Sequence, residues 1–186
     1  GGVRFDRPRL DLAALRAWKE GVVQRLTGGL GQLRSARRIR FLRGRARFAD
    51  HRTIEIDEGG AVRRLPFDRA ILATGSRPAA LPFLPASPRI MDSTAALDLP
   101  DVPARLLVVG GGYIGLELGS AYAALGSRVS VVEMTPGLLP GADADLVQPL
   151  ARRLGKAFES ILLNTKIVAA RDEGASVRVT FETPDG

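Results

Sequence analysis

The sequence has 186 residues, a length that accommodates one large domain or parts of two. Apolar residues make up 45% of it and charged residues 25%, which is typical of a packed globular protein and excludes wholesale disorder. The net charge of +7 comes almost entirely from arginine, and because there is no cysteine, this stretch of chain carries no disulfide, thiol nucleophile or zinc–thiolate site.

The composition also bears on location and metal binding. No apolar run reaches the roughly 18–20 residues that cross a bilayer, and no targeting pattern is recognisable, so we expect a cytoplasmic protein without a membrane partner. The chain starts at Gly1 without a Met and stops in a turn-like segment at 183–186, and we interpret both ends as cuts through a longer protein. The only histidine, His51, lies in a polar turn, and no carboxylate pair has a histidine at ligand spacing, so no metal site is expected.

The first predicted element is a helix over residues 11–35. Its apolar residues recur at helical spacing, and Asp11 is placed to cap the first turn. Gly28, Gly29 and Gly31 each weaken a helix by about 1 kcal/mol relative to alanine. We therefore expect a bend, or a close approach by another backbone, at these glycines.

Strand-like runs follow at residues 38–42, 45–48 and 53–57, and Gly59-Gly60 is typical of a hairpin turn before residues 61–65. The same region contains the densest basic run, RSARRIRFLRGRARF. A basic patch for nucleic acid is one interpretation of this run. Because arginines alternate with apolar residues and no nucleic-acid motif is present, we favour a strand with one solvated face and expect no nucleic-acid partner.

The middle of the chain has the composition of a boundary. Residues 70–78, AILATGSRP, are predicted to form a compact strand, and Ser93 is placed to cap a short helix over residues 94–99. Residues 79–104 are rich in proline, which is typical of a connector. We therefore expect one domain over residues 1–78, a connector over 79–104, and a second domain over 105–186 that is incomplete at its C-terminus.

The remaining residues alternate between predicted strands and helices. A helix over residues 115–125 is expected to end at Gly126, and a second helix to begin at Asp143 or Asp145 and run to about residue 158. Strands are predicted at residues 106–109, 128–133, 161–168 and 177–182. This order predicts an α/β, Rossmann-like fold, a doubly wound parallel sheet continued by a β-hairpin.

The stretch LLVVGGGYIGLELGS, residues 106–120, places Gly110, Gly112 and Gly115 between a strand and a helix. This spacing in this context predicts a dinucleotide-binding turn. Gly110 permits a tight turn, Gly112 lets a pyrophosphate approach the backbone, and Gly115 lets helix and strand pack closely. The pyrophosphate then lies at the helix N-terminus, where free N–H groups and the helix dipole favour an anion. Gly119, one turn later, is explained by the same close packing.

Glu133 indicates which nucleotide the turn holds. It ends the second strand, 23 residues after Gly110, where an acidic side chain reaches the adenosine ribose hydroxyls. A carboxylate there accepts hydrogen bonds from a free 2′-hydroxyl and repels a 2′-phosphate. The next residues, Met134, Thr135 and Pro136, include no lysine or arginine to receive a phosphate. The sequence therefore favours NAD over NADP.

Four stretches of the chain resemble one family. They are WKEGVVQRLTGGL, AILATGSRP, the segment 88–134 around the glycine turn, and LLNTKI at 162–167. Together they are similar, along essentially the whole chain, to the flavin disulfide oxidoreductases (class I pyridine nucleotide-disulfide oxidoreductases), and within them to the dihydrolipoamide dehydrogenases of bacterial 2-oxo acid dehydrogenase complexes. The resemblance implies that residues 1–78 are part of an FAD-binding domain and that the turn at 110–115 is a second glycine turn, for NAD.

The resemblance also implies which residues contact the cofactors. Tyr113 matches a position that covers the flavin when nicotinamide is absent, and Glu117 matches a carboxylate near the nicotinamide. For FAD the implied contacts are Ala46, Thr74, Gly75 and Ser76, although turn chemistry alone also accounts for Thr74 and Ser76. For NAD the implied contacts are Gly110, Gly111, Gly112, Tyr113, Ile114, Gly115, Leu116, Glu117, Glu133 at the ribose and Ile167 at the adenine.

The same resemblance implies an activity and its partners. The whole enzyme would oxidise dihydrolipoamide, carried on a lipoyl domain of the acyltransferase component, and pass electrons through a redox disulfide and FAD to NAD. It would be a homodimer. The family's first FAD glycine fingerprint, redox cysteines and His–Glu base dyad are absent from this sequence. We therefore expect an inactive interior fragment with no catalytic residue of its own.

Two other classes of function stay open. A related enzyme on the same frame, such as a soluble transhydrogenase or mercuric reductase, shares most of these motifs. A non-catalytic nucleotide-binding module, used for assembly or for binding an acidic partner through the arginines, is the other.

Overall fold

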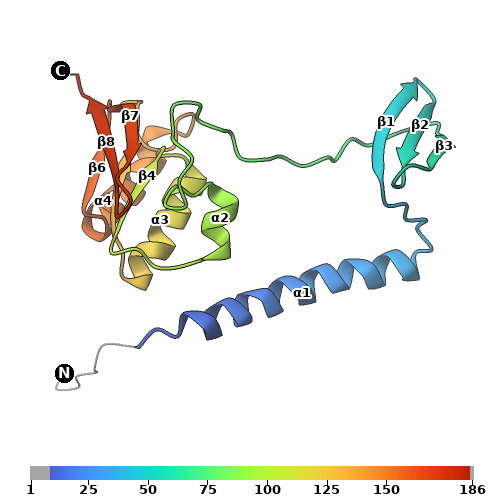
Figure 1. Ribbon diagram of the computed structural model, residues 1–186, viewed down its shortest axis with the longest axis horizontal. Helices are drawn as coiled ribbons and strands as arrows, with labels where there is room; N and C mark the ends of the chain where they lie inside the picture. The colour runs from blue at the N-terminus through green and yellow to red at the C-terminus, as the bar shows by residue number, and fades with distance from the viewer. Residues whose placement is uncertain (1–8, 185–186) are drawn as a thin grey trace. The chain divides into compact units, whose positions relative to one another are not determined.

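The computed structural model describes residues 9–184, which form two compact units, one made of Ala13–Arg77 and one made of residues 9–12 and 78–184 (Figure 1). The first unit contains a long helix and an antiparallel sheet, and the second contains a parallel sheet, its helices and a hairpin. No helix in residues 9–184 is long and apolar enough to cross a membrane.

The predicted first helix is confirmed as α1, Leu12–Ala36. It is continuous, and a Cβ added at Gly28, Gly29 or Gly31 would meet no atom within 4 Å, so the expected close approach of another backbone is wrong. Arg38 closes the helix in the left-handed conformation (φ 54°), with hydrogen bonds from Arg38 N to Ser35 O and from Ile39 N to Arg34 O. The strand predicted at residues 38–42 is wrong because this chain reversal takes up its start, and residues 39–44 pair with no strand in the described chain.

The antiparallel sheet consists of β1 (Arg45–Asp50), β2 (Thr53–Asp57) and β3 (Val62–Pro66) in that order. The predicted hairpin at Gly59-Gly60 is confirmed, because both glycines have positive φ (90° and 105°). Asp57 Oδ1 accepts hydrogen bonds from both of their amides, at 3.0 and 2.7 Å. The hairpin fixes the register of β2 against β3.

The strand predicted at residues 70–78 is wrong. The segment has no ladder partner among the described residues, and Ile71 is 94% exposed. Its apolar composition suits a buried strand, but a strand forms only where a neighbour supplies its hydrogen bonds.

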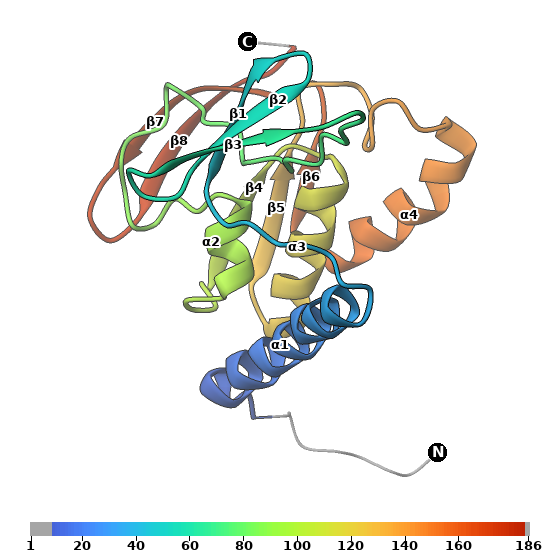
Figure 2. The same ribbon diagram turned by 90° about the vertical axis from the view of Figure 1, so that its right-hand side faces the viewer.

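The parallel sheet consists of β4 (Arg105–Val109), β5 (Arg128–Val132) and β6 (Ser160–Leu162). α3 (Tyr113–Leu125) connects the first pair and packs along it, and α4 (Ala144–Ala157) connects the second (Figure 2). The central strand carries the core, because Val129 and Val131 are 0% exposed. The Rossmann-like fold is confirmed, and the order β4-β5-β6 is one half of a doubly wound sheet.

The helix ends follow their capping residues. Gly126 ends α3 with φ 115°, as predicted, and Asp143 is the residue before α4. The short helix α2 (Ser93–Asp98) is capped by Asp92 and not by Ser93, because Asp92 Oδ1 accepts from Ala95 N at 2.8 Å.

The strand predicted at residues 161–168 is two strands in two sheets. β6 ends at Leu162, and β7 (Lys166–Asp172) pairs antiparallel with β8 (Val177–Glu182) as the expected hairpin. Asn164 lies between them with φ 49°, and its amide donates to Thr135 O at 3.0 Å. A left-handed residue cannot continue a strand, so the chain turns out of the parallel sheet at Asn164.

Candidate nucleotide-binding site

The predicted dinucleotide turn lies between β4 and α3. Gly110 has φ 103°, a conformation that favours glycine, and its amide donates to Val132 O at 2.8 Å. Gly112 is the N-cap of α3, and the first helical bond runs from Leu116 N to Gly112 O. The amides of Tyr113, Ile114 and Gly115 therefore have no acceptor within the helix and can bind an anion.

The other two motif glycines, Gly112 and Gly115, and the nearby Gly119 each have a separate reason in the geometry. A Cβ added at Gly112 would meet no atom within 4 Å, which leaves open space beside the turn. A Cβ at Gly115 would lie 2.4 Å from Gly110 O and 2.9 Å from Val108 Cγ1, so only glycine allows helix and strand to pack this closely. The atoms nearest to a Cβ added at Gly119 are side-chain carbons, the closest being Phe158 Cζ at 3.3 Å. The helix therefore packs closely at Gly119 too, but an added methyl group would meet movable side chains instead of backbone.

Glu133 lies directly beside this turn. It is 6% exposed, its Oε2 accepts from Gly111 N at 2.7 Å, and its Oε1 accepts from Thr135 N at 2.8 Å. Burial alone would raise the pKa of Glu133, but the hydrogen bonds from Gly111 and Thr135 outweigh it and hold the pKa below its usual value of 4.5. The side chain is therefore a carboxylate at neutral pH, with lone pairs left to accept from hydroxyl groups.

The other residues predicted to contact NAD lie in α3 and β7. Tyr113 is 68% exposed and Ile114 46% exposed, whereas Leu116 is buried at 3% and anchors the helix. Glu117 is exposed. Ile167 is buried in β7, two residues after Thr165, whose amide donates to Glu133 O at 2.9 Å. The structure therefore links the segment around Ile167 to the end of β5.

The residues predicted to contact FAD lie in the other unit. Ala46 is exposed in β1, opposite Ile56 of β2. Thr74, Gly75 and Ser76 lie in the exposed irregular segment, where Gly75 has φ 74°. No cluster of acidic, histidine or cysteine side chains in the described residues could hold a metal ion.

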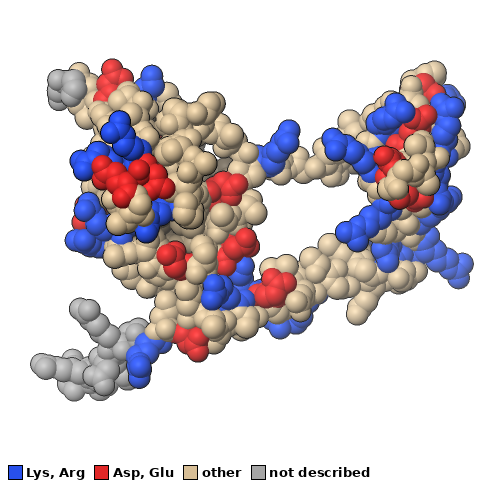
Figure 3. Space-filling view, in the orientation of Figure 1, with Lys and Arg blue, Asp and Glu red and all other residues tan. Residues whose placement is uncertain are grey.

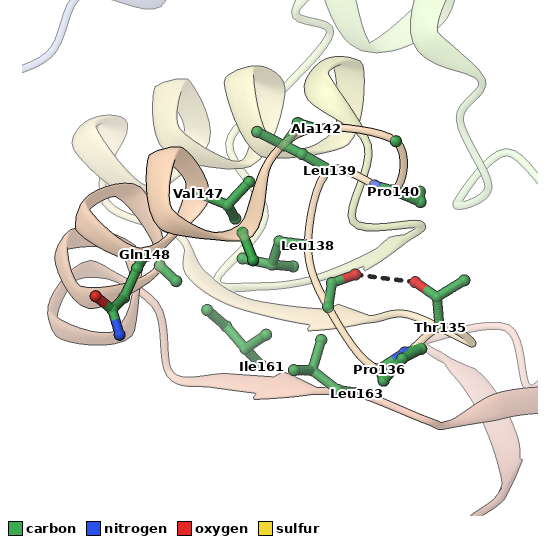
Figure 4. Close-up of a pocket in the computed structure, with 14 residues that line it drawn as sticks. Thr135, Pro136, Leu138, Leu139, Pro140, Ala142, Val147, Gln148, Ile161 and Leu163 are labelled. Atoms are coloured by element: carbon green, nitrogen blue, oxygen red, sulfur yellow. Dashed lines mark hydrogen bonds between the residues drawn. The ribbon is translucent and has the colours of Figure 1, made fainter.

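A pocket that the sequence did not predict lies under the segment that follows β5. The segment 135–142 covers a space of about 590 Å³ whose other walls are α4 and β6. Leu138, Val147, Ile161 and Leu163 point toward one another there (Figure 4), and Thr135 Oγ1 donates to Gly137 O at 2.9 Å. In the sequence, the prolines and glycines of this segment predict a loop. They do not indicate which residues the loop contacts.

The arginine-rich run is partly neutralised by its own sheet. Lys and Arg side chains gather over the part of the molecule that contains β1–β3 (Figure 3). Glu55 of β2 lies opposite Arg47 of β1 and Arg64 of β3, and both pair with it, Arg64 Nε at 3.3 Å from Oε1. Arg34 covers the ring of Phe41 at 4.6 Å. These contacts explain part of the basic composition by local structure.

The sequence matches a family described as pyridine nucleotide-disulphide oxidoreductase over residues 4–186. Among curated proteins, it is 47% identical over 180 residues to the dihydrolipoyl dehydrogenase of Haemophilus influenzae, covering 95% of this chain and 37% of that protein. It is 43% identical over 184 residues to that of Vibrio cholerae, covering 97% of this chain and 38% of that protein. The chain thus spans less than two fifths of the length of these relatives.

Solved structures give the same result for the fold. LpdA from Mycobacterium tuberculosis superimposes with a TM-score of 0.83 at 26% identity, over 96% of this chain and 40% of that one. A mutant of the HOCl-induced flavoprotein disulfide reductase RclA from Escherichia coli, solved as its Cu(II) complex, superimposes with a TM-score of 0.80 at 26% identity, over 93% of this chain and 40% of that one.

Proposed function

The chain belongs to the pyridine nucleotide-disulphide oxidoreductase family, and from this we propose that it is the NAD-binding segment, with part of the FAD-binding segment, of a dihydrolipoyl dehydrogenase. Family membership implies a flavin and a nicotinamide cofactor. We assign residues 1–78 to the FAD domain, 79–104 to the connector and 105–186 to the NAD domain. The curated relatives named dihydrolipoyl dehydrogenase supply the substrate class.

The observation that carries the proposal is the ionised, buried carboxylate of Glu133 next to the glycine turn. Its hydrogen bond to Gly111 N supports the proposal, because a nucleotide whose pyrophosphate lay on the first amides of α3 would pass close to this carboxylate. The next basic residue along the chain after Glu133 is Arg152. A 2′-phosphate would therefore meet a negative charge and no cation in the residues that directly follow β5, which favours NAD over NADP.

The residues of the turn fit the nicotinamide dinucleotide in shape as well as charge. Gly112 leaves the space that a bound pyrophosphate would fill, because no atom lies within 4 Å of a Cβ built there. Tyr113 and Glu117 lie on the first turns of α3 with exposed side chains, where they would flank the nicotinamide end. Ile167 would contact the adenine side. Bound NAD accepts a hydride, and the residues of this chain bind and orient it.

For the FAD segment we propose contacts from Ala46 and from Thr74, Gly75 and Ser76. The exposed loop and the positive φ of Gly75 (74°) permit a close approach by a ligand. This sequence contains no cysteine, so the disulfide step and its base would belong to other parts of the whole protein. The partners proposed for that protein are a second copy, in a homodimer, and a lipoyl domain bearing dihydrolipoamide, in the cytoplasm.

Turnover of the full-length protein tests the substrate. We expect dihydrolipoamide-dependent reduction of NAD, followed by NADH absorbance, and negligible reduction of NADP. Glu133→Arg in the same protein should lower the rate with NAD, with Glu159→Arg at the opposite end of the sheet as the matched control. A protein that reduced Hg²⁺, or that exchanged hydride between NADH and NADP, without oxidising dihydrolipoamide would identify one of the related enzymes instead.

A further inference from the structure

Gly111 occupies the variable position of the glycine motif, yet its surroundings constrain it as well. Its amide donates to Glu133 Oε2 at 2.7 Å, and its carbonyl accepts from Leu139 N at 2.9 Å. A Cβ added to Gly111 would lie 2.7 Å from Leu138 Cδ2 and 3.2 Å from Glu133 Cβ. Both polar groups and the Cα of Gly111 are therefore in contact with the segment that follows β5.

That segment, residues 135–139, is itself fixed on its other side. Leu138 is 6% exposed and points into the apolar pocket formed with Val147 and Ile161 (Figure 4). Leu139 has φ 50°, a conformation that is unfavourable for an L-residue and persists only where surrounding contacts enforce it. Its hydrogen bond to Gly111 O is one such contact.

We infer that residues 135–139 form a clamp on the nucleotide turn, and that Glu133, Gly111 and Leu138 are positioning residues for the amides that receive the pyrophosphate. The clamp ties Gly111 to the α4–β6 side of the sheet, so the peptide between Gly110 and Gly112 is held before any ligand arrives. Such preorganisation lowers the ordering cost of binding. This inference rests on the proposed function, since it assumes that the turn binds a pyrophosphate.

The inference gives Glu133 a second role, separate from its contact with the ribose. If Glu133 acts only on the ribose hydroxyls, neutralising it affects only ligands that carry those hydroxyls. If it also holds Gly111, the same substitution weakens every ligand that uses the turn. Glutamine has the shape of glutamate, but its amide nitrogen cannot accept a hydrogen bond, so one of the amides of Gly111 and Thr135 would lose its partner.

Binding of ADP and of 2′,3′-dideoxy-ADP to the full-length protein separates the two roles. We expect Glu133→Gln to weaken dideoxy-ADP by about tenfold or more, because a buried amide is left without an acceptor, and to weaken ADP at least as much. Glu159→Gln, on the other end of the sheet, should leave both affinities unchanged. Weaker binding of ADP with unchanged binding of dideoxy-ADP would overturn the clamp and leave the ribose role intact.

Gly111→Ala tests the contact between Gly111 and Leu138, and the measured quantity is recovery of ADP binding in a double variant. The added methyl collides with Leu138, so we expect weaker ADP binding and partial recovery in the double variant Gly111→Ala/Leu138→Ala. Gly155→Ala, where a Cβ meets no atom within 4 Å, is the matched control. Absence of recovery in the double variant would argue against the contact with Leu138.

Amide hydrogen exchange in the ligand-free protein tests the clamp without any bound nucleotide, and so independently of the proposed function. Glu133→Ala, which removes both side-chain oxygens, should speed exchange at Gly111 by about tenfold or more, because the acceptor of that amide is lost. Unchanged exchange at Gly111 would overturn the clamp whatever the protein binds. Failure of the unsubstituted protein to bind ADP or NADH would instead overturn the proposed function.

Discussion

Alanine substitution should destabilise the fold at Gly115 but not at Gly119, although these two glycines of α3 lie one helical turn apart. A Cβ at Gly115 would lie 2.4 Å from the backbone oxygen of Gly110, which cannot move without displacing the turn. A Cβ at Gly119 would lie no closer than 3.3 Å to the side-chain carbons of Phe158, Val108 and Val129, which can shift by a few tenths of an ångström.

The magnitudes follow from two opposing effects. Replacing glycine by alanine within a helix stabilises it by about 1 kcal/mol. Overpacking costs about 1–3 kcal/mol, and the upper value applies where a backbone atom is in the way. Gly115→Ala should therefore lower the free energy of unfolding by about 2 kcal/mol, whereas Gly119→Ala should change it by less than about 0.5 kcal/mol.

Urea denaturation followed by circular dichroism measures both variants against the unsubstituted protein. NADH affinity should fall with Gly115→Ala, because the displaced turn carries the amides proposed to bind pyrophosphate, and should be kept in Gly119→Ala. Equal losses of stability in the two variants, or a fully stable Gly115→Ala protein, would refute the packing argument.

Three further results are expected. Tyr122→Phe removes the hydrogen bond from the buried Tyr122 hydroxyl to Ala96 O (2.9 Å), which joins α3 to α2, and should lower the free energy of unfolding in urea by about 1 kcal/mol; no change would mean that the bond does not contribute. Folding lowers the pKa of Glu133 below 4.5, so the carboxylate stabilises the fold above that pH and loses this contribution as the pH falls further. The difference in free energy of unfolding between the unsubstituted protein and Glu133→Gln should therefore shrink in acid. A difference that stays constant from pH 7 to pH 3 would contradict the assigned hydrogen bonds. Gly29→Ala adds a methyl group to open space on α1 and should stabilise that helix by up to about 1 kcal/mol, measured by thermal melting of the helical circular dichroism signal; a lower melting temperature would show that Gly29 is needed for a contact.

Local patterns in the sequence were sufficient to predict the nucleotide turn. The strand that ends before Gly110 and the helix that ends at Gly126 depend on burial and on glycine conformations, and both leave a signal within a few residues. The same holds for the hairpin at Gly59-Gly60, where the turn residues and Asp57 are adjacent in the chain.

The predictions that failed depended on partners distant in sequence. AILATGSRP has the composition of a buried strand, but strand formation requires hydrogen bonds from a neighbour, and none of the described residues supplies them. Residues 38–42 alternate like a strand, yet Arg38 takes a left-handed conformation to close α1. The contact of Leu138 with Gly111 spans 27 residues and involves the variable position of the motif, so no local pattern could have indicated it.

The affinity of the full-length protein for NADH and for NADPH tests the central claim most directly. We propose that the carboxylate of Glu133 binds the ribose, and the chain has no lysine or arginine between Glu133 and Arg152. Titration calorimetry should therefore give a preference for NADH of at least about tenfold, or roughly 1.4 kcal/mol, that is lost in Glu133→Ala. Equal affinities for the two nucleotides, or a preference that survives Glu133→Ala, would contradict the assignment of this turn to NAD.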